Sequence, residues 1–103
     1  MKTVVLPAAR ADIIRQIGYF IDIGQEHIAD RFLAAARTAI EHLSHTPEAG
    51  PPRPIRNPRL AGLRTWPIEG FDDMKIYYLV ADDALTVVRI LHGRRDIERI
   101  LEQ

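Results

Sequence analysis

Cysteine is absent from this 103-residue chain. Without a thiol the protein has no disulfide, no thiolate nucleophile and no zinc–sulfur site. Long apolar runs are missing too: the longest covers residues 76–81, and a membrane span needs roughly 20 residues. The apolar stretch before Pro7 is too short for a signal peptide. We therefore expect a soluble, cytoplasmic protein that does not enter a membrane.

A surplus of charge is the next thing that the sequence lacks. The chain has 14 basic and 14 acidic residues, so its formal net charge is zero. A neutral protein is not drawn as a whole to nucleic acid or to an anionic membrane, although a local basic cluster stays possible. The length predicts a single domain over residues 1–103.

The first half of the chain predicts one strand and two helices. Residues 3–6 are short, apolar and rich in β-branched side chains, which favours a strand. Apolar residues then recur at helical spacing over residues 8–23 and again over 25–45. Gly24 stands where a C-terminal helix cap is expected, and the connection is short. The two helices should therefore form an antiparallel hairpin.

The second half predicts a small sheet. Five of the seven prolines fall within residues 46–62, which makes that segment a stiff, extended connection. Strand-like runs follow at residues 63–68, 74–80 and 85–91, separated by short turns, and Asp96 can cap a final helical turn. The order β-α-α-β-β-β predicts a two-layer α+β fold, with the hairpin packed on a mostly antiparallel sheet.

Alternation along the strands predicts which side chains share a face. The residues assigned to the helix side are Ile76, Tyr78, Val80, Val88 and Ile90. The open face then carries Lys75, Tyr77 and Arg89, with Arg64 as a weaker candidate, and Arg94 and Arg95 follow the last strand. These residues form the one local basic cluster that the sequence predicts.

Three stretches in this order resemble the RelE/ParE toxin superfamily. They are Pro-Ala-Ala-Arg-Ala-Asp at residues 7–12, the middle-strand segments at residues 62–64 and 75–78, and Val-Val-Arg-Ile-Leu-His-Gly-Arg-Arg-Asp at residues 87–96. The resemblance implies a toxin of a type II toxin–antitoxin system. RelE-like members cut messenger RNA on the ribosome, whereas ParE-like members poison DNA gyrase. An antitoxin whose C-terminal segment wraps the toxin neutralises both kinds.

The residues favour the ParE-like activity, which is not enzymatic. By resemblance, Lys75 with Arg94 or Arg95 would supply the cations of an RNA-cleaving site. RNA cleavage also needs a general acid, and His92 is the candidate because no tyrosine follows Arg95. Strand alternation points His92 toward the helices, however, and a neutral chain suits ribosomal RNA poorly. The alternatives left open are a ribosome-dependent endonuclease and an inactive toxin that only binds its antitoxin.

The expected partners are DNA gyrase and a ParD-like antitoxin, bound in a hetero-oligomer, and no sequence-specific binding of nucleic acid is expected. A basic sheet face would favour an antitoxin segment that is acidic and apolar by turns. The residues predicted to contact the target or the antitoxin are Arg64, Lys75, Tyr77, Arg89, Arg94 and Arg95. No cofactor is expected. No metal site is expected either, since His42 and His45 lie three residues apart without a third ligand nearby.

Overall fold

The computed structural model describes residues 1–93 and 97–101. Its elements, in chain order, are β1 (Lys2–Val5), α1 (Pro7–Asp22), α2 (Glu26–His45), the 3₁₀ turn η1 (Pro58–Leu60), β2 (Arg64–Ile68), β3 (Phe71–Ala81), β4 (Ala84–His92) and α3 (Ile97–Leu101). This order confirms the predicted α+β class and the β-α-α-β-β-β arrangement. No helix in the described ranges is both long and apolar enough to cross a membrane.

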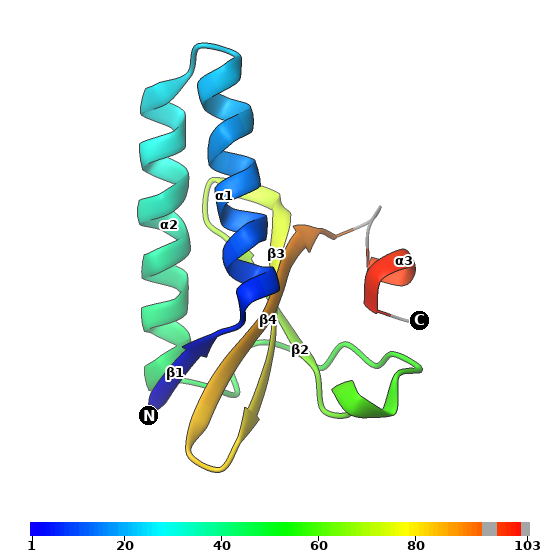
Figure 1. The fold of residues 1–103 in the computed structure, drawn as a ribbon. Helices are drawn as coiled ribbons and strands as arrows, with labels where there is room; N and C mark the ends of the chain where they lie inside the picture. Colours follow the sequence, from blue (N-terminus) through cyan, green and yellow to red (C-terminus); the bar gives the residue numbers. More distant parts are fainter. Residues whose placement is uncertain (94–96, 102–103) are drawn as a thin grey trace.

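The two long helices form the expected hairpin (Figure 1). Pro7 opens α1, at a position where its missing N–H loses no helical bond. The turn between the helices uses Gly24, whose φ of +76° suits glycine, and its N–H donates to the Ile21 carbonyl at 2.9 Å. Phe20 and Phe32 then meet across the hairpin, with ring centroids 6.1 Å apart.

The sheet has the order β1-β4-β3-β2. The first strand lies parallel to β4, with Lys2 opposite Ala84, and the other neighbours are antiparallel. A two-residue turn joins β3 to β4 through Asp82 and Asp83, whose φ values of 53° and 61° match the hairpin turn with two left-handed residues. The sheet is therefore mostly antiparallel, as predicted.

The proline-rich connection protects the outer edge of β2. The Thr65 N–H donates to the Pro51 carbonyl at 3.1 Å, and the Arg53 N–H donates to the Leu63 carbonyl at 2.8 Å. Two residues beyond Thr65, the same outward position is taken by Pro67, which has no N–H. The rest of this edge thus offers a poor template for another strand.

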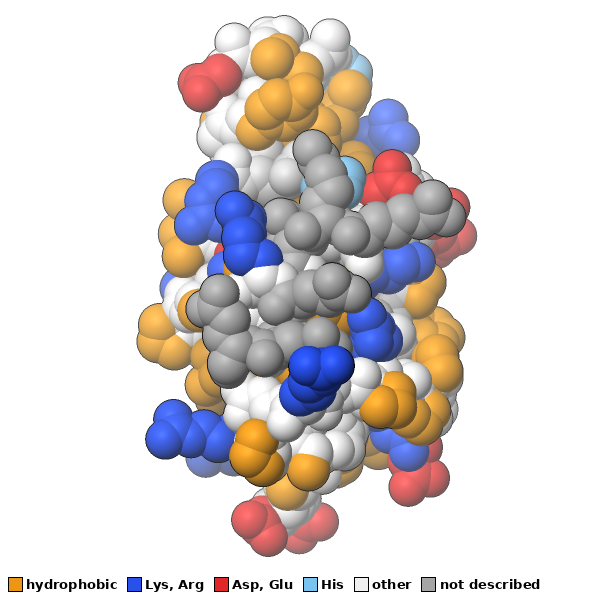
Figure 2. All heavy atoms as spheres, turned by 90° about the vertical axis from the view of Figure 1, so that its right-hand side faces the viewer, with side chains coloured by type: hydrophobic (Ala, Val, Ile, Leu, Met, Phe, Trp, Pro, Cys, Tyr) orange, Lys and Arg blue, Asp and Glu red, His pale blue; other side chains and the backbone are white. Residues whose placement is uncertain are grey.

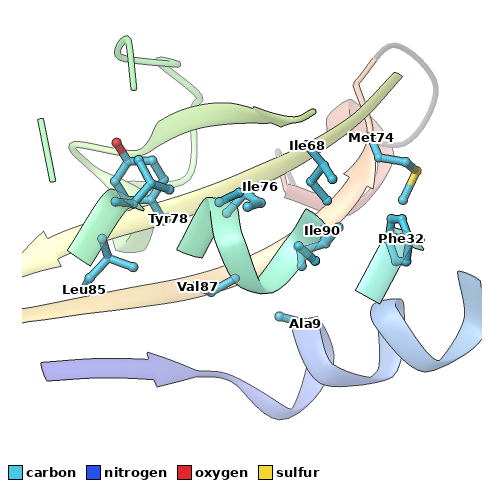
Figure 3. Packing of buried hydrophobic residues seen from close by; sticks show 12 residues of the cluster. Ala9, Phe32, Ile68, Met74, Ile76, Tyr78, Leu85, Val87 and Ile90 are labelled. Atoms are coloured by element: carbon cyan, nitrogen blue, oxygen red, sulfur yellow. The ribbon is translucent and has the colours of Figure 1, made fainter. Parts of the chain in front are cut away.

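The helical hairpin covers one face of the sheet and buries the main core. Figure 3 shows Phe32 of α2 and Ala9 of α1 facing side chains of β3 and β4. The buried residues of this cluster are Ala9, Phe32, Ala36, Ala39, Leu43, Ile68, Met74, Ile76, Tyr78, Leu85, Val87 and Ile90. The predicted inward placement of Ile76, Tyr78 and Ile90 is confirmed.

The opposite face of the sheet is also covered, which the sequence reasoning did not expect. Figure 1 shows α3 and the segment that carries η1 on the side of the sheet away from the hairpin. There they help to bury a second cluster: Leu63, Tyr77, Val88, Leu91, Ile97 and Leu101. Tyr77 is 2% exposed, so its predicted position on an open surface is wrong.

A β-bulge explains the errors in the predicted faces. Tyr77 pairs with Arg89, but Tyr78 pairs with Val87, so Val88 is an extra residue in β4. One extra residue reverses the alternation along the strand. Val88 therefore belongs to the second cluster, whereas Val87 packs under the hairpin. Val80 pairs with Leu85 of the main core, so it lies on the predicted side of the sheet, where it is 36% exposed.

Candidate functional site

A polar hollow lies on the sheet face away from the hairpin. Its volume is about 620 Å³, and it opens between the outer face of β2 and β3, the end of β4 and the proline-rich connection. The residues that line it are Arg53, Thr65, Asp72, Asp73, Lys75, Tyr77, His92 and Gly93. We call it the Lys75 hollow.

The Lys75 side chain packs closely against Gly93, which directly follows β4. A Cβ atom at Gly93 would lie 2.9 Å from Lys75 Cγ, which is too close, and at an ordinary contact distance of 3.7 Å from the Tyr77 hydroxyl oxygen. The Lys75 side chain is half-buried. Its ammonium group makes no hydrogen bond or ion pair with any described residue. This cation is therefore available to a ligand.

Two hydroxyl groups lie beside Lys75. Burial raises the pKa of the Tyr77 phenol, and the positive charge of Arg53 and a weak hydrogen bond with the Thr65 hydroxyl oppose that rise. The phenol is therefore protonated near neutral pH and can donate a hydrogen bond. The Thr65 hydroxyl oxygen is buried and interacts only weakly with this phenol, without a hydrogen bond of full geometry to any described residue. Arg53 also lines the hollow and donates to the Pro54 carbonyl at 3.1 Å.

Carboxylates share the hollow with these donors. Asp72 and Asp73 are exposed and also line it, so the charges of its described Lys, Arg, Asp and Glu residues cancel. Figure 2 shows Lys and Arg side chains spread over this face, with Asp and Glu side chains at its margins. The described residues can bind a single anionic group here, but by themselves they do not form a broad basic surface.

His92 occupies the end of β4 between two hollows. It lines the Lys75 hollow, and it also lines a smaller space on the α1 side together with Asp12, Arg15 and Gln16. His92 therefore borders a space on the helix side, as predicted, but it also borders the Lys75 hollow on the other side of the sheet. Its predicted role as a general acid stays a prediction.

Arg89 does not belong to the Lys75 hollow. It forms a two-pronged ion pair with Asp12 of α1, from Nε to Oδ2 at 2.7 Å and from Nη2 to Oδ1 at 2.8 Å. Asp12 is 3% exposed and also accepts from the Ile90 N–H at 3.0 Å and from Arg15 at 3.1 Å. Arg89 pairs with Tyr77 in the sheet, as the predicted shared face requires, but its guanidinium group is engaged by Asp12 and does not lie open beside Lys75. Arg89 instead joins the sheet to α1.

Arg64 is likewise engaged within the chain. Its Nη1 donates to the Gly50 carbonyl at 2.7 Å and to the Glu48 carbonyl at 3.2 Å. Tyr78 holds the same loop, since its hydroxyl accepts from the Gly50 N–H at 2.9 Å and donates to the Pro47 carbonyl at 2.8 Å. Of the predicted contact residues, Lys75 and Tyr77 come together, whereas Arg64 and Arg89 anchor other parts. The predicted contacts Arg94 and Arg95, and the cap Asp96, lie outside the described residues.

A second, more apolar hollow of about 650 Å³ lies between α2 and β2. It is lined by Ala35, Thr38, Ala39, His42, Trp66, Pro67, Glu69 and Asp72. The His42 ring packs against Trp66 with centroids 5.3 Å apart, while His45 pairs with Glu41 at 3.0 Å. Among the side chains that the structure describes, no three His, Asp or Glu residues are placed to share a metal ion.

Comparison with known proteins identifies the family. The sequence profile of the ParE toxin of type II toxin–antitoxin systems, parDE, matches residues 4–97, which include both hollows. The chain belongs to the ParE toxin family. The ParE fold is seen again in a solved structure described as the chromosomal ParDE TA system from P. aeruginosa. The two chains superpose with a TM-score of 0.73 at 18% identity, over 89% of this chain and 95% of that chain. No curated protein sequence gives a significant match.

Proposed function

We propose that this ParE-family toxin stops bacterial growth in the cytoplasm by poisoning DNA gyrase, and that a ParD-like antitoxin neutralises it. Family membership carries the toxin part of this proposal. The choice of gyrase over RNA rests chiefly on the mixed charge of the Lys75 hollow. A surface that binds a phosphate backbone needs several unopposed cations, whereas among the described lining residues Asp72 and Asp73 offset Lys75 and Arg53.

The chemistry available in the hollow supports the same choice. Cleavage of RNA needs a base for the 2′-hydroxyl and an acid for the leaving oxygen. The Tyr77 phenol has a raised pKa because of burial, so it is a poor base near neutral pH. A protein target imposes none of these requirements on the toxin.

The hairpin supports the antitoxin part of the proposal. Four large apolar side chains of α1 and of the turn after it are exposed: Ile14 (63%), Tyr19 (55%), Ile21 (48%) and Ile23 (52%). Exposed apolar side chains that gather on one element are typical of a protein-binding surface. A folding-on-binding antitoxin segment could cover them.

The test combines the purified chain with DNA gyrase and with ribosomes. With gyrase and plasmid DNA, we expect loss of supercoiling or accumulation of cleaved DNA. With ribosomes and messenger RNA, we expect no cuts. Cut messenger RNA that disappears with Lys75→Met, but persists with the control Lys2→Met, would establish the endonuclease instead. Expression of folded protein without growth arrest would identify an inactive toxin.

A further inference from the structure

We propose that the Lys75 hollow is a binding site for a carboxylate side chain of an acidic peptide. The identity of that peptide as the antitoxin segment rests on the proposed function, but the chemistry of the hollow does not. The site joins β2, β3 and the end of β4, and it is separate from the exposed apolar side chains of the helical hairpin.

Unsatisfied donors carry this inference. Lys75, whose side chain is half-buried, has no ion-pair partner among the described residues, and the buried Thr65 hydroxyl has only a weak interaction with the Tyr77 phenol there. Polar groups withdrawn from water without a partner raise the free energy of the folded state. The protonated Tyr77 hydroxyl lies beside both. A carboxylate can accept from all three groups, because its two oxygens offer about four lone-pair directions.

The neighbouring groups favour a carboxylate on a peptide over the phosphates of RNA. Asp72 and Asp73 line the same hollow, and their charges repel a chain that carries a negative charge on every unit. One carboxylate flanked by neutral peptide groups meets much less of this repulsion. Asp72 also lines the second hollow, where Ala35, Ala39 and Trp66 offer apolar contacts. Adjoining polar and apolar hollows fit a segment that is acidic and apolar by turns.

Gly93 controls the space in which the ligand is held. Its Cα lies so close to Lys75 that an added Cβ would come within 2.9 Å of Cγ. The substitution Gly93→Ala therefore displaces the Lys75 side chain while leaving every charge in place. This variant separates a positioned ammonium group from simple long-range attraction.

The test is an NMR titration of the full chain with three probes. The first is the peptide acetyl-Leu-Glu-Leu-Glu-Leu-Glu-amide, the second is the same peptide with Gln in place of Glu, and the third is a ten-residue oligouridylate. We expect the Glu peptide to shift the resonances of Lys75, Tyr77 and Gly93. We expect the Gln peptide to bind at least about tenfold more weakly than the Glu peptide, which is the effect of losing a charge-assisted hydrogen bond.

Variants complete the test. Lys75→Met and Gly93→Ala should each weaken binding of the Glu peptide at least about fivefold. That change corresponds to a modest part of the free energy of one charge-assisted hydrogen bond. Lys2→Met, which removes the only other lysine, should leave its affinity unchanged. Thermal unfolding checks that each variant is folded, and Lys75→Gln, which also removes the positive charge, provides a second substitution if Lys75→Met is not.

Three results would overturn the site: equal binding of the Gln peptide, no effect of either hollow variant, or tighter binding of oligouridylate than of the Glu peptide. A failure of the proposed function is distinguishable. If the peptide binds as expected while gyrase stays active, the site stands and the toxin mechanism falls. If gyrase is inhibited while the Glu and Gln peptides bind equally, the proposed toxin mechanism stands and the carboxylate site is refuted.

Discussion

Replacing Asp12 should remove the strongest polar connection between α1 and the sheet. The carboxylate is 3% exposed and receives two bonds from Arg89 and one from the Ile90 N–H. Breaking one side of a buried ion pair destabilises a protein by about 3–5 kcal/mol. Arg89 keeps a further interaction, so we expect Asp12→Ala to cost about 3 kcal/mol, the lower end of that range.

This loss is large for a chain of this size. A domain is typically stable by roughly 5–15 kcal/mol, and a loss of about 3 kcal/mol lowers Tm by at least about 12 °C. Urea unfolding, monitored by circular dichroism, gives the free energy directly if the slope m is unchanged. Arg15→Ala is the matched control. Arg15 also bonds Asp12, but its side chain is 71% exposed, so its loss should change stability by less than about 1 kcal/mol.

A double variant tests the cause. Asp12→Ala combined with Arg89→Met removes both charges together, so the pair of substitutions should destabilise by at least about 1 kcal/mol less than the sum of the two single changes. If Asp12→Ala stays within about 1 kcal/mol of the parent protein, or if the two changes simply add, the assignment of Asp12 as the link between α1 and β4 is refuted.

Three further predictions concern stability and association. Burial raises the pKa of Tyr77 and Tyr78 above the usual 10.0, so the unfolded chain loses these protons at a lower pH than the folded chain. The contribution of these groups to stability should therefore be constant below about pH 10 and fall as the pH rises through the folded-state pKa values. Urea midpoints between about pH 8 and 11 can check this. Gly50→Ala should destabilise the protein by about 1–3 kcal/mol, because the added Cβ would lie 2.5 Å from the Thr65 carbonyl oxygen. An unchanged thermal unfolding temperature would contradict this close approach. Pro67→Val restores an outward N–H on the edge of β2 and should promote self-association, measured by light scattering at constant protein concentration.

Local patterns predicted most of the fold because they depend on neighbouring residues. The helices followed from their apolar spacing, and Gly24 marked the turn between them. The α+β class and the element order were correct for the same reason. The bulge at Val88 could not be predicted, since alternation by itself gives no sign of an inserted residue. The covering of the second sheet face was missed because α3 has only five residues and its contacts come from distant parts of the chain.

The candidate site was predicted only in part. Lys75 and Tyr77 do lie together, because they are two residues apart on one strand and no bulge separates them. The ion pair of Arg89 was missed, since its partner Asp12 lies 77 residues away and nothing local indicates their pairing. Arg53 and Thr65 were missed as lining residues for a similar reason. The proline-rich connection folds back beside β2, and the sequence shows only that it is extended.

The parallel pairing of the first and last strands also sets a schedule for synthesis. Lys2 finds its partner in Ala84, 82 residues later, so β1 leaves the ribosome long before any strand exists for it to join. At about 5–20 residues per second, the ribosome needs roughly 4–16 s to supply that partner. The helical hairpin can form early from local contacts, but during this interval its apolar face has no complete sheet to pack against. An incomplete chain is therefore unable to assemble the toxin fold, and one truncated before β4 should be left to chaperones and proteases.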